Sequence, residues 1–388
     1  MEGSIMLKEW KSKRQLSLFV ALALSAGGRG LLSDFQSAYA ADVTGGNVVV
    51  DAGHPAPTPV AAGNAHDIPG ATDNRNVTGN KLTISGETMG IPLYGGYTQG
   101  AGDATHNEVV FKNGALTNGN VYGGWSANGN ATHNTITLSG TAATWWNAIY
   151  HYGGASGNPS ADVTTGNLLK VTTKDNHVYG ITNFEKMQFD LSSGIASGDT
   201  MLQTAVGQTF DWGNISVTGA ADWAAANGSG SKRITLYTDG TLTLNNYNVT
   251  GTVSGNYEYG LNSNATGTGT VSASKLYFDV NQFQNADVTQ STAGSGILFA
   301  GTSTLGSTTN HNKLTVSGVT WNGAIFGGYT QGAGDATHNE VVLKNGAMAG
   351  DDLYGGWSAN GNATYNTVTL SGTAATWAHA KYYYGGGS

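Results

Sequence analysis

The feature that most constrains this chain is an internal duplication, because residues 79–156 align without a gap with residues 311–388 at an offset of 232 positions. Long stretches of the two copies are identical. Each copy also contains a shorter period: Gly-Gly pairs begin at Gly95, Gly123 and Gly153, 28 and 30 residues apart. Periods of roughly 20 to 50 residues are typical of solenoids, in which each coil buries its apolar row against its neighbours.

Each repeat unit combines an aromatic residue, a Gly-Gly pair, a polar turn ending in Asn, and a short alternating strand. Glycine makes up 59 of the 388 residues, and apolar residues at helical spacing are missing after the N-terminal region. The pattern predicts an all-β fold, a right-handed parallel β-helix or β-solenoid with Gly-Gly-aromatic repeats. We expect Val109, Ile136 and Leu138 to face a narrow core, with Gly or Asn at the positive-φ corners.

Aromatic residues flank the Gly-Gly pairs in every unit. Tyr94, Tyr122, Tyr150 and Tyr152 are expected to form columns along the solenoid, because periodic positions usually serve the stacking of the repeat. Four further aromatic residues in these columns are the candidates for stacking against a ligand. They are Tyr97, Trp125, Tyr329 and Trp357.

The first forty residues are typical of an export signal. Four basic residues between positions 8 and 14 precede the apolar run 16–26, which is well short of the ~20 residues that span a bilayer. Small residues at Ala38 and Ala40 precede Ala41, so we expect cleavage after Ala40. The protein is therefore expected to cross the inner membrane and to reach the cell surface, the outer membrane or the medium.

The remaining chain divides into four predicted parts. Residues 41–78 contain several prolines and are interpreted as a loosely ordered N-terminal cap. Repeat block one covers 79–161, and repeat block two covers 311–388. The intervening residues 162–310 are predicted to be an all-β spacer, with one short helical turn at Asp222–Ala226.

Charge and cysteine content limit the classes of partner. The formal net charge is −8, and no basic stripe is present, which argues against nucleic acid as a partner. The chain has no Cys, so its stability must come from stacked backbone and buried side-chain rows.

Residues suited to catalysis or metal binding are sparse, and no cofactor or metal is predicted. Asp103, His106 and Glu108 have the side chains of a metal site, but Asp103 lies in a turn where Asp commonly bonds its own backbone. Zinc, serine-nucleophile and phosphate-loop motifs are missing from the sequence. The acids of the spacer form only a loose group, so an enzyme is not expected. They are Glu185, Asp190, Asp199 and Asp222.

The units that end in Asn-Thr-Ile-Thr-Leu-Ser-Gly (134–140) and Asn-Thr-Val-Thr-Leu-Ser-Gly (366–372) resemble the repeat passengers of autotransporter, type V secreted proteins. The segment 181–189, followed by 198–202, is similar to spacers found between such repeats. The resemblance implies a surface-exposed, adhesin-like β-helix. It also implies a C-terminal β-barrel that engages the outer-membrane assembly machinery. Since this sequence carries none, we expect it to be the N-terminal part of a longer protein or the product of a truncated gene.

The expected function is adhesion by many weak contacts with host or bacterial surface glycans or proteins. Two alternatives remain. One is a carbohydrate-active β-helix enzyme, which requires a cleft with clustered acids. The other is a purely structural surface spacer, which binds nothing.

Overall fold

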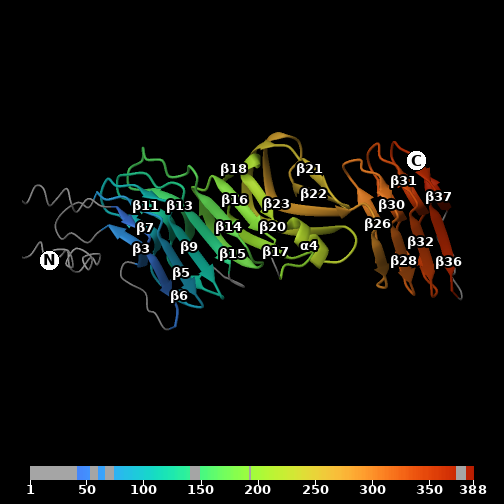
Figure 1. The fold of residues 1–388 in the computed structure, drawn as a ribbon, viewed down its shortest axis with the longest axis horizontal. Coiled ribbons are helices and arrows are strands. Elements are labelled where there is room, and N and C mark those ends of the chain that lie inside the picture. The colour runs from blue at the N-terminus through green and yellow to red at the C-terminus, as the bar shows by residue number, and fades with distance from the viewer. Residues whose placement is uncertain (1–41, 53–59, 66–73, 140–148, 192–193, 373–381) are drawn as a thin grey trace, which may run out of the picture.

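The computed structural model describes residues 42–52, 60–65, 74–139, 149–191, 194–372 and 382–388. Strands dominate these residues, and parallel pairing between successive coils builds an elongated β-solenoid (Figure 1). The predicted all-β, parallel solenoid is therefore confirmed, while its right-handedness stays a prediction. Regular helix in the described part is confined to α4 (Ala220–Ala226), which contains the expected helical turn, and to the single 3-10 turn η1 (Trp212–Asn214).

A first stack of coils is built from two long sheets that face each other across a narrow core. One sheet is called here the Gly-Gly sheet, because β7, β11 and β13 each carry a Gly-Gly pair. It contains β3 (Val60–Ala65), β7 (Leu93–Thr98), β11 (Val121–Ser126), β13 (Tyr150–Ser156), β15 (Asn176–Thr182) and β17 (Thr200–Val206). The other contains β2 (Asn47–Val50), β5 (Lys81–Ser85), β9 (Glu108–Lys112), β12 (Thr135–Ser139), β14 (Leu168–Val171), β16 (Lys186–Asp190) and β19 (Ile215–Thr218). Short strands close the coils: β1 (Val43–Thr44), β4 (Val77–Thr78), β8 (Ala104–Thr105), β6 (Thr88–Met89) and β10 (Leu116–Thr117).

A second stack repeats this arrangement with four sheets. The counterpart of the Gly-Gly sheet contains β26 (Leu298–Ser303), β30 (Ile325–Thr330), β34 (Leu353–Ser358) and β37 (Tyr383–Gly387), and the last three of these strands carry Gly-Gly pairs. Facing them are β24 (Asp287–Gln290), β28 (Lys313–Ser317), β32 (Glu340–Lys344) and β36 (Thr367–Ser371). The closing strands are β25 (Gly294–Ser295), β29 (Thr320–Asn322), β33 (Met348–Ala349), β27 (Thr309–Asn310), β31 (Ala336–Thr337) and β35 (Ala363–Thr364).

Between the stacks the pairing changes from parallel to antiparallel. The long strand β20 (Lys232–Tyr247) pairs in parallel with β17 and with β18 (Thr209–Asp211), and antiparallel with β23 (Gly269–Gln282). Two further antiparallel strands, β21 (Gly251–Ser254) and β22 (Tyr257–Ser263), extend this sheet. The spacer is thus all-β apart from η1 and α4, as predicted, but residues 232–282 within it contain an antiparallel insertion that the repeat pattern did not reveal.

The buried residues form two separate cores. One runs from Val50 to Val280 and includes the predicted core residues Val109, Ile136 and Leu138. The other runs from Ala286 to Leu353. The structural boundary therefore lies near residues 283–286, and β24–β27 are coils of the second stack. Similarly, strands β1–β4 pair with the solenoid sheets, so the described part of the predicted cap belongs to the first stack.

A buried row of asparagines, here called the Asn ladder, joins the coils at one corner. The Asn107 amide nitrogen Nδ2 donates to Asn134 Oδ1 at 3.1 Å, while Asn107 Oδ1 accepts from Asn80 Nδ2 at 2.9 Å. The same amides also satisfy backbone groups of adjacent coils, such as Val77 O. The interior members Asn107, Asn134 and Asn339 bond an asparagine on each side, so the ladder fixes the register of the stack. Its members are Asn80, Asn107, Asn134 and Asn167 in the first stack, and Asn312, Asn339 and Asn366 in the second.

The Gly-Gly pairs leave room for this ladder. A Cβ at Gly96 would overlap the Asn107 amide, and a Cβ at Gly95 would overlap the backbone oxygen of Gly123 in the next coil. The positive-φ residue at this corner is His106, directly before Asn107, whereas Gly or Asn was expected there. The Asn side chain is needed inside the ladder, so the strained backbone position falls on the residue before it.

Candidate binding surface: the aromatic columns

Two aromatic columns lie on the outer face of the Gly-Gly sheet. In β7 the side chain of Leu93 is buried, whereas Tyr94 and Tyr97 stay partly exposed on either side of the glycines. The alternation of a strand directs these rings outward, and the in-register parallel pairing places each ring against its counterpart in the next coil. The predicted columns are therefore present, except that Tyr150 is not a member: it is tilted 42° against Tyr152, is edge-on to Tyr179, and pairs in register with Gly180.

The inner column of the first stack consists of Tyr94, Tyr122 and Tyr152. Their ring centroids are 5.0 and 4.9 Å apart, and the planes are nearly parallel. Burial, followed by the neighbouring Tyr122 and Tyr97, raises the pKa of the Tyr94 phenol to about 12. The Tyr94 hydroxyl group is therefore neutral at physiological pH.

The outer column of the first stack pairs Tyr97 with Trp125, with ring centroids 4.8 Å apart and an interplanar angle of 13°. In the second stack Tyr329 and Trp357 repeat this pair at 4.8 Å and 12°. The structure thus brings the four predicted ligand-stacking residues together as two equivalent pairs.

Each outer column ends on its tryptophan in the same way. The next residue in register is Ala155 above Trp125 and Gly387 above Trp357, so no ring follows either indole at that position. In the inner column of the second stack, by contrast, Phe326, Tyr354 and Tyr384 continue at 4.9 and 4.7 Å.

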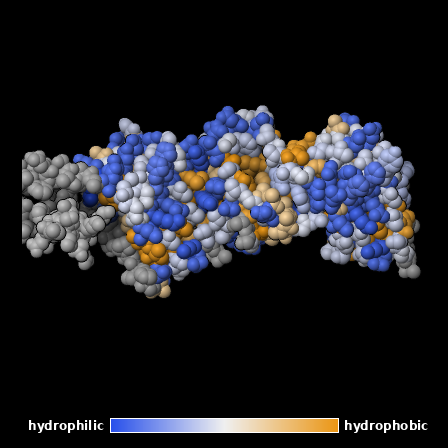
Figure 2. Space-filling view, in the orientation of Figure 1, coloured by the Kyte–Doolittle hydropathy of each residue, from blue (hydrophilic) through white to orange (hydrophobic). Residues whose placement is uncertain are grey.

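The geometry limits how these rings can bind. Rings less than ~5 Å apart already cover each other's faces, so a planar ligand cannot enter between them. The ring edges and the hydroxyl groups remain for contacts, and beyond each terminal indole lies only a small residue, Ala155 or Gly387. The surface suits shallow binding at repeated positions, and the view in Figure 2 shows a mostly hydrophilic exterior with scattered apolar patches.

The residues weighed as a metal site have separate partners. Asp103 Oδ1 accepts from the Asn130 backbone N–H at 2.7 Å, in the next coil and not within its own turn as the sequence predicted. Glu108 pairs with Lys81 at 2.8 Å, and the His106 ring stacks on His133 at 4.9 Å. Within the described residues, no group of three or more His, Cys, Asp or Glu side chains is arranged to hold a metal ion.

Histidine rings of adjacent coils also stack on each other. His106 and His133 stack in the first stack of coils, and His311, His338 and Tyr365 stack at 5.1 and 5.0 Å in the second. These rings lie at the corner next to the Asn ladder, so their spacing follows from the coil spacing.

The acids of the spacer are likewise held apart by different partners. Glu185 accepts a hydrogen bond from the Gly166 backbone N–H, Asp199 pairs with Lys174 at 3.1 Å, and Asp190 lies 3.8 Å from Lys170. Asp222 lies in the first turn of α4. They do not form a shared cleft.

No known protein-family model, characterised protein or solved structure matches this chain. The fold itself defines the class of protein, a β-solenoid with outward aromatic columns. Among the described residues, helices are too short or too polar to cross a membrane. The predicted cleavage residues Ala38, Ala40 and Ala41 lie outside the described residues.

Proposed function

We propose that this protein is an exported surface passenger of the autotransporter type that adheres through many weak contacts with glycans or proteins of host or bacterial surfaces. The observation that carries the proposal is the pair of equivalent aromatic columns, each ending on a tryptophan. Two such platforms on one chain act together when the target presents its groups densely, because the second contact is then intramolecular.

Enzymatic activity receives less support. The acids that the sequence offered for catalysis are paired with separate lysines or backbone groups. Glycoside hydrolysis requires two carboxyl groups roughly 5 to 10 Å apart across one bond, with one of them free to exchange a proton.

Adhesion is tested with the Trp125→Ala and Trp357→Ala variants and their combination, in binding to immobilised bacteria, epithelial cells and surface glycans. Each single variant is expected to weaken binding about tenfold or less, and the double variant by more than the singles together, because avidity is lost. Tyr365→Ala is the matched control, since this ring is 79% exposed and lies outside both columns. Wild-type binding by a folded double variant would refute the proposal, and a wild type that binds none of these surfaces would favour a structural spacer.

Export is tested separately by fractionating the native cells and sequencing the N-terminus of the recovered protein. The proposal predicts a chain that begins at Ala41 in the outer-membrane or extracellular fraction. An intact Met1 terminus in the cytoplasm would contradict it.

A further inference from the structure

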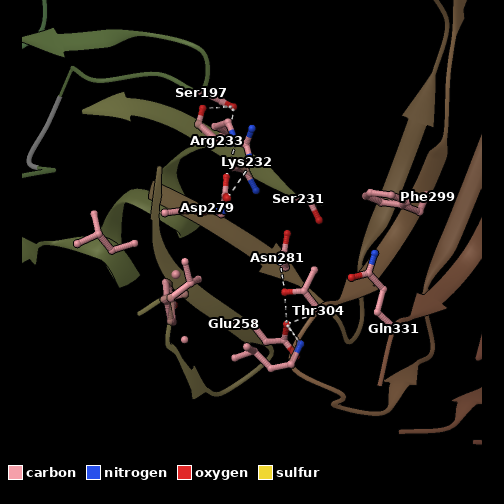
Figure 3. A pocket seen from close by; sticks show the side chains of 17 residues that line it. Ser197, Ser231, Lys232, Arg233, Glu258, Asp279, Asn281, Phe299, Thr304 and Gln331 are labelled. Atoms are coloured by element: carbon pink, nitrogen blue, oxygen red, sulfur yellow. Dashed lines mark hydrogen bonds and ion pairs between the residues drawn. The ribbon is translucent and has the colours of Figure 1, made fainter. Parts of the chain in front are cut away.

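A groove of about 750 Å³ lies where the antiparallel insertion meets the second stack (Figure 3). One wall comes from β20, β22 and β23, and the other from β26 and the turns that follow β26 and β30. Ser231 and Asn281 lie on the first side, and Phe299 and Gln331 lie on the other. Its volume is within the range of sites that hold a small molecule, roughly 300 to 1,000 Å³.

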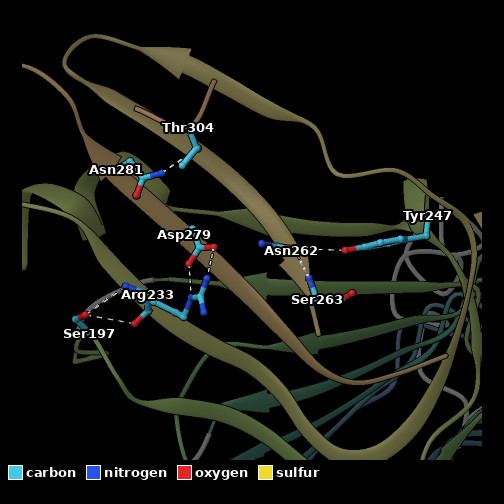
Figure 4. Close-up of polar contacts among 8 residues, drawn as sticks. All are labelled: Ser197, Arg233, Tyr247, Asn262, Ser263, Asp279, Asn281 and Thr304. Atoms are coloured by element: carbon cyan, nitrogen blue, oxygen red, sulfur yellow. Dashed lines mark hydrogen bonds and ion pairs between the residues drawn. The ribbon is translucent and has the colours of Figure 1, made fainter. Parts of the chain in front are cut away.

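The first wall is held rigidly by an ion pair. Arg233 donates to both carboxylate oxygens of Asp279, at 2.5 and 2.8 Å, and its guanidinium lies 4.5 Å from the Tyr277 ring centre (Figure 4). A bidentate pair that also stacks on an aromatic ring keeps its geometry better than a simple surface pair.

A buried glutamate fixes the floor and connects the two cores. Glu258 is 2% exposed and accepts hydrogen bonds from Ser303 Oγ at 2.6 Å, the Thr304 N–H at 2.9 Å and the Leu305 N–H at 3.2 Å. Asn281 also donates to Thr304 Oγ1, at 3.2 Å. The groove therefore exists before any ligand arrives, which reduces the entropic cost of binding.

Polar groups in the groove still have bonding capacity. Ser231 Oγ is buried and has no hydrogen-bond partner among the described residues. Lys232 is 7% exposed and its ammonium donates to Gly230 O at 2.9 Å, which uses one of three N–H groups. Buried polar groups of this kind are normally satisfied, so they indicate a polar ligand.

The lining defines the chemistry of that ligand. The four charged side chains of the lining, Lys232, Arg233, Glu258 and Asp279, have a net formal charge of zero, so the groove as a whole attracts neither anions nor cations. The aromatic rings of Tyr259 and Phe299 offer apolar faces beside these polar groups. A neutral, hydroxyl-rich molecule with apolar ring faces fits this combination.

We infer that the junction groove is a binding site for a short neutral oligosaccharide, held by Ser231 and Lys232 on one side and by Phe299 and Gln331 on the other. Both acids of the groove are occupied by structural bonds, so the site binds sugar without cleaving it. Phe299 lies in register with Phe326 and its ring centroid is 6.1 Å from that of Tyr329, so the groove adjoins the first rings of the second stack's columns. Trp357 follows Tyr329 on the side away from the groove, and the inference does not rest on the proposed adhesive role.

The test is titration of the full chain with cellotriose, maltotriose and chitotriose, and with trigalacturonate as the anionic comparator, followed by calorimetry or ligand-observed NMR. We expect at least one neutral trisaccharide to bind with a millimolar or lower Kd and trigalacturonate to bind more weakly. Failure of all three neutral sugars, or a preference for the anion, would overturn the inference.

Two variants and one control locate the binding. Gln331→Trp fills the groove from an exposed position and is expected to weaken trisaccharide binding more than tenfold. Ser231→Val removes the hydroxyl group and is expected to weaken binding about tenfold. Gln99→Trp is the matched control, because Gln99 is the exposed counterpart of Gln331 in the first stack. Unchanged binding by Gln331→Trp, or equal loss in Gln99→Trp, would overturn the inference. The double tryptophan variant of the columns should bind the trisaccharide normally, so the two proposals can fail independently.

Discussion

The two repeat blocks place nearly the same sequence in two settings, and the differences between them separate residues that build the fold from residues that it tolerates. The Asn ladder, the Gly-Gly pairs and the outer Tyr-Trp pairs are the same in both stacks. The interior row differs: His151 is fully buried in the first stack, whereas its counterpart Tyr383 is 41% exposed in the last described coil. The corner also differs, since His133 becomes Tyr365 and the ring stack is kept.

This comparison teaches that the coil spacing, more than the identity of any one ring, produces the columns. Stacked parallel strands lie roughly 4.8 Å apart, and equivalent rings therefore meet at the same spacing. Buried residues that bond to both neighbouring coils cannot be exchanged in the way that the stacked rings can. Substitutions at matched positions in the two stacks test this distinction between buried bonding residues and stacked rings.

The largest effect is expected for Asn107→Ala and its counterpart Asn339→Ala. Asn107→Ala removes the acceptor of the buried Asn80 N–H and the donor to the buried Val77 carbonyl. Asn339→Ala does the same to the Asn312 N–H and the Thr309 carbonyl. Orphaned buried groups should lower the free energy of unfolding by about 3 to 5 kcal/mol in either stack. Denaturant unfolding measures the change, with exposed Asn128→Ala as control. A change below 1 kcal/mol in both stacks would contradict the ladder's role.

His151 should make the first stack sensitive to acid. Burial lowers the pKa of the His151 imidazole to about 3, so at pH 4 the unfolded chain binds a proton that the folded chain does not. The stability that this group contributes is present above about pH 6.5 and is lost as the pH falls toward 3, which amounts to about 3 kcal/mol between pH 7 and 4.

The His151→Leu variant should therefore show a flatter dependence of unfolding free energy on pH than the wild type. Tyr383→Leu, at the matched position, is the control and should leave the slope unchanged between pH 7 and 4. Equal slopes in wild type and His151→Leu would show that the imidazole is not buried in the neutral form.

The Gly-Gly pairs should tolerate no side chain. Gly96→Ala and Gly328→Ala place a Cβ against the ladder amides of Asn107 and Asn339, which are already fixed by their own bonds. We expect a loss of about 1 to 3 kcal/mol in each stack, measured by thermal or denaturant unfolding. Gly90→Ala is the control, because nothing lies within 4 Å of the added carbon. Neutral substitutions at Gly96 and Gly328 would break the account of the Gly-Gly pairs.

The smallest effect is expected for the ion pairs on the outer face. Lys81 contacts Glu108 at 2.8 Å and Lys313 contacts Glu340 at 3.2 Å, with about half of each lysine side chain exposed. Lys81→Ala and Lys313→Ala should each cost about 0 to 1 kcal/mol, and the cost should shrink in high salt. A loss above 2 kcal/mol would mean that these pairs, too, determine the fold.

Much of the fold followed from the sequence, because the repeat period and the alternation of Val109, Ile136 and Leu138 are local signals. The aromatic columns followed for the same reason. The burial of the Asn ladder did not, since Asn before a strand is equally typical of an exposed turn. The alignment of His151 with Leu93 and Val121 in the interior row was the available signal for its burial.

The junction groove was beyond sequence reasoning because its residues come from distant strands. Arg233 meets Asp279 only through the antiparallel register of β20 and β23, and Glu258 reaches Thr304 only after the second stack has docked. The single local hint was the unusually long alternating run of β20, which exceeds the strands of a solenoid coil.

The central claim is that both blocks form parallel coils in one register, and disulfide trapping tests it most directly because the chain has no native Cys. The register pairs Ser85 with Lys112 and Ser317 with Lys344. Paired residues on strands roughly 4.8 Å apart have a Cα–Cα distance that a disulfide can bridge. The variants Ser85→Cys/Lys112→Cys and Ser317→Cys/Lys344→Cys should therefore each form a disulfide rapidly within one chain. The out-of-register variant Lys81→Cys/Lys112→Cys should not. Cross-linking of the out-of-register pair, or of neither in-register pair, would contradict the account.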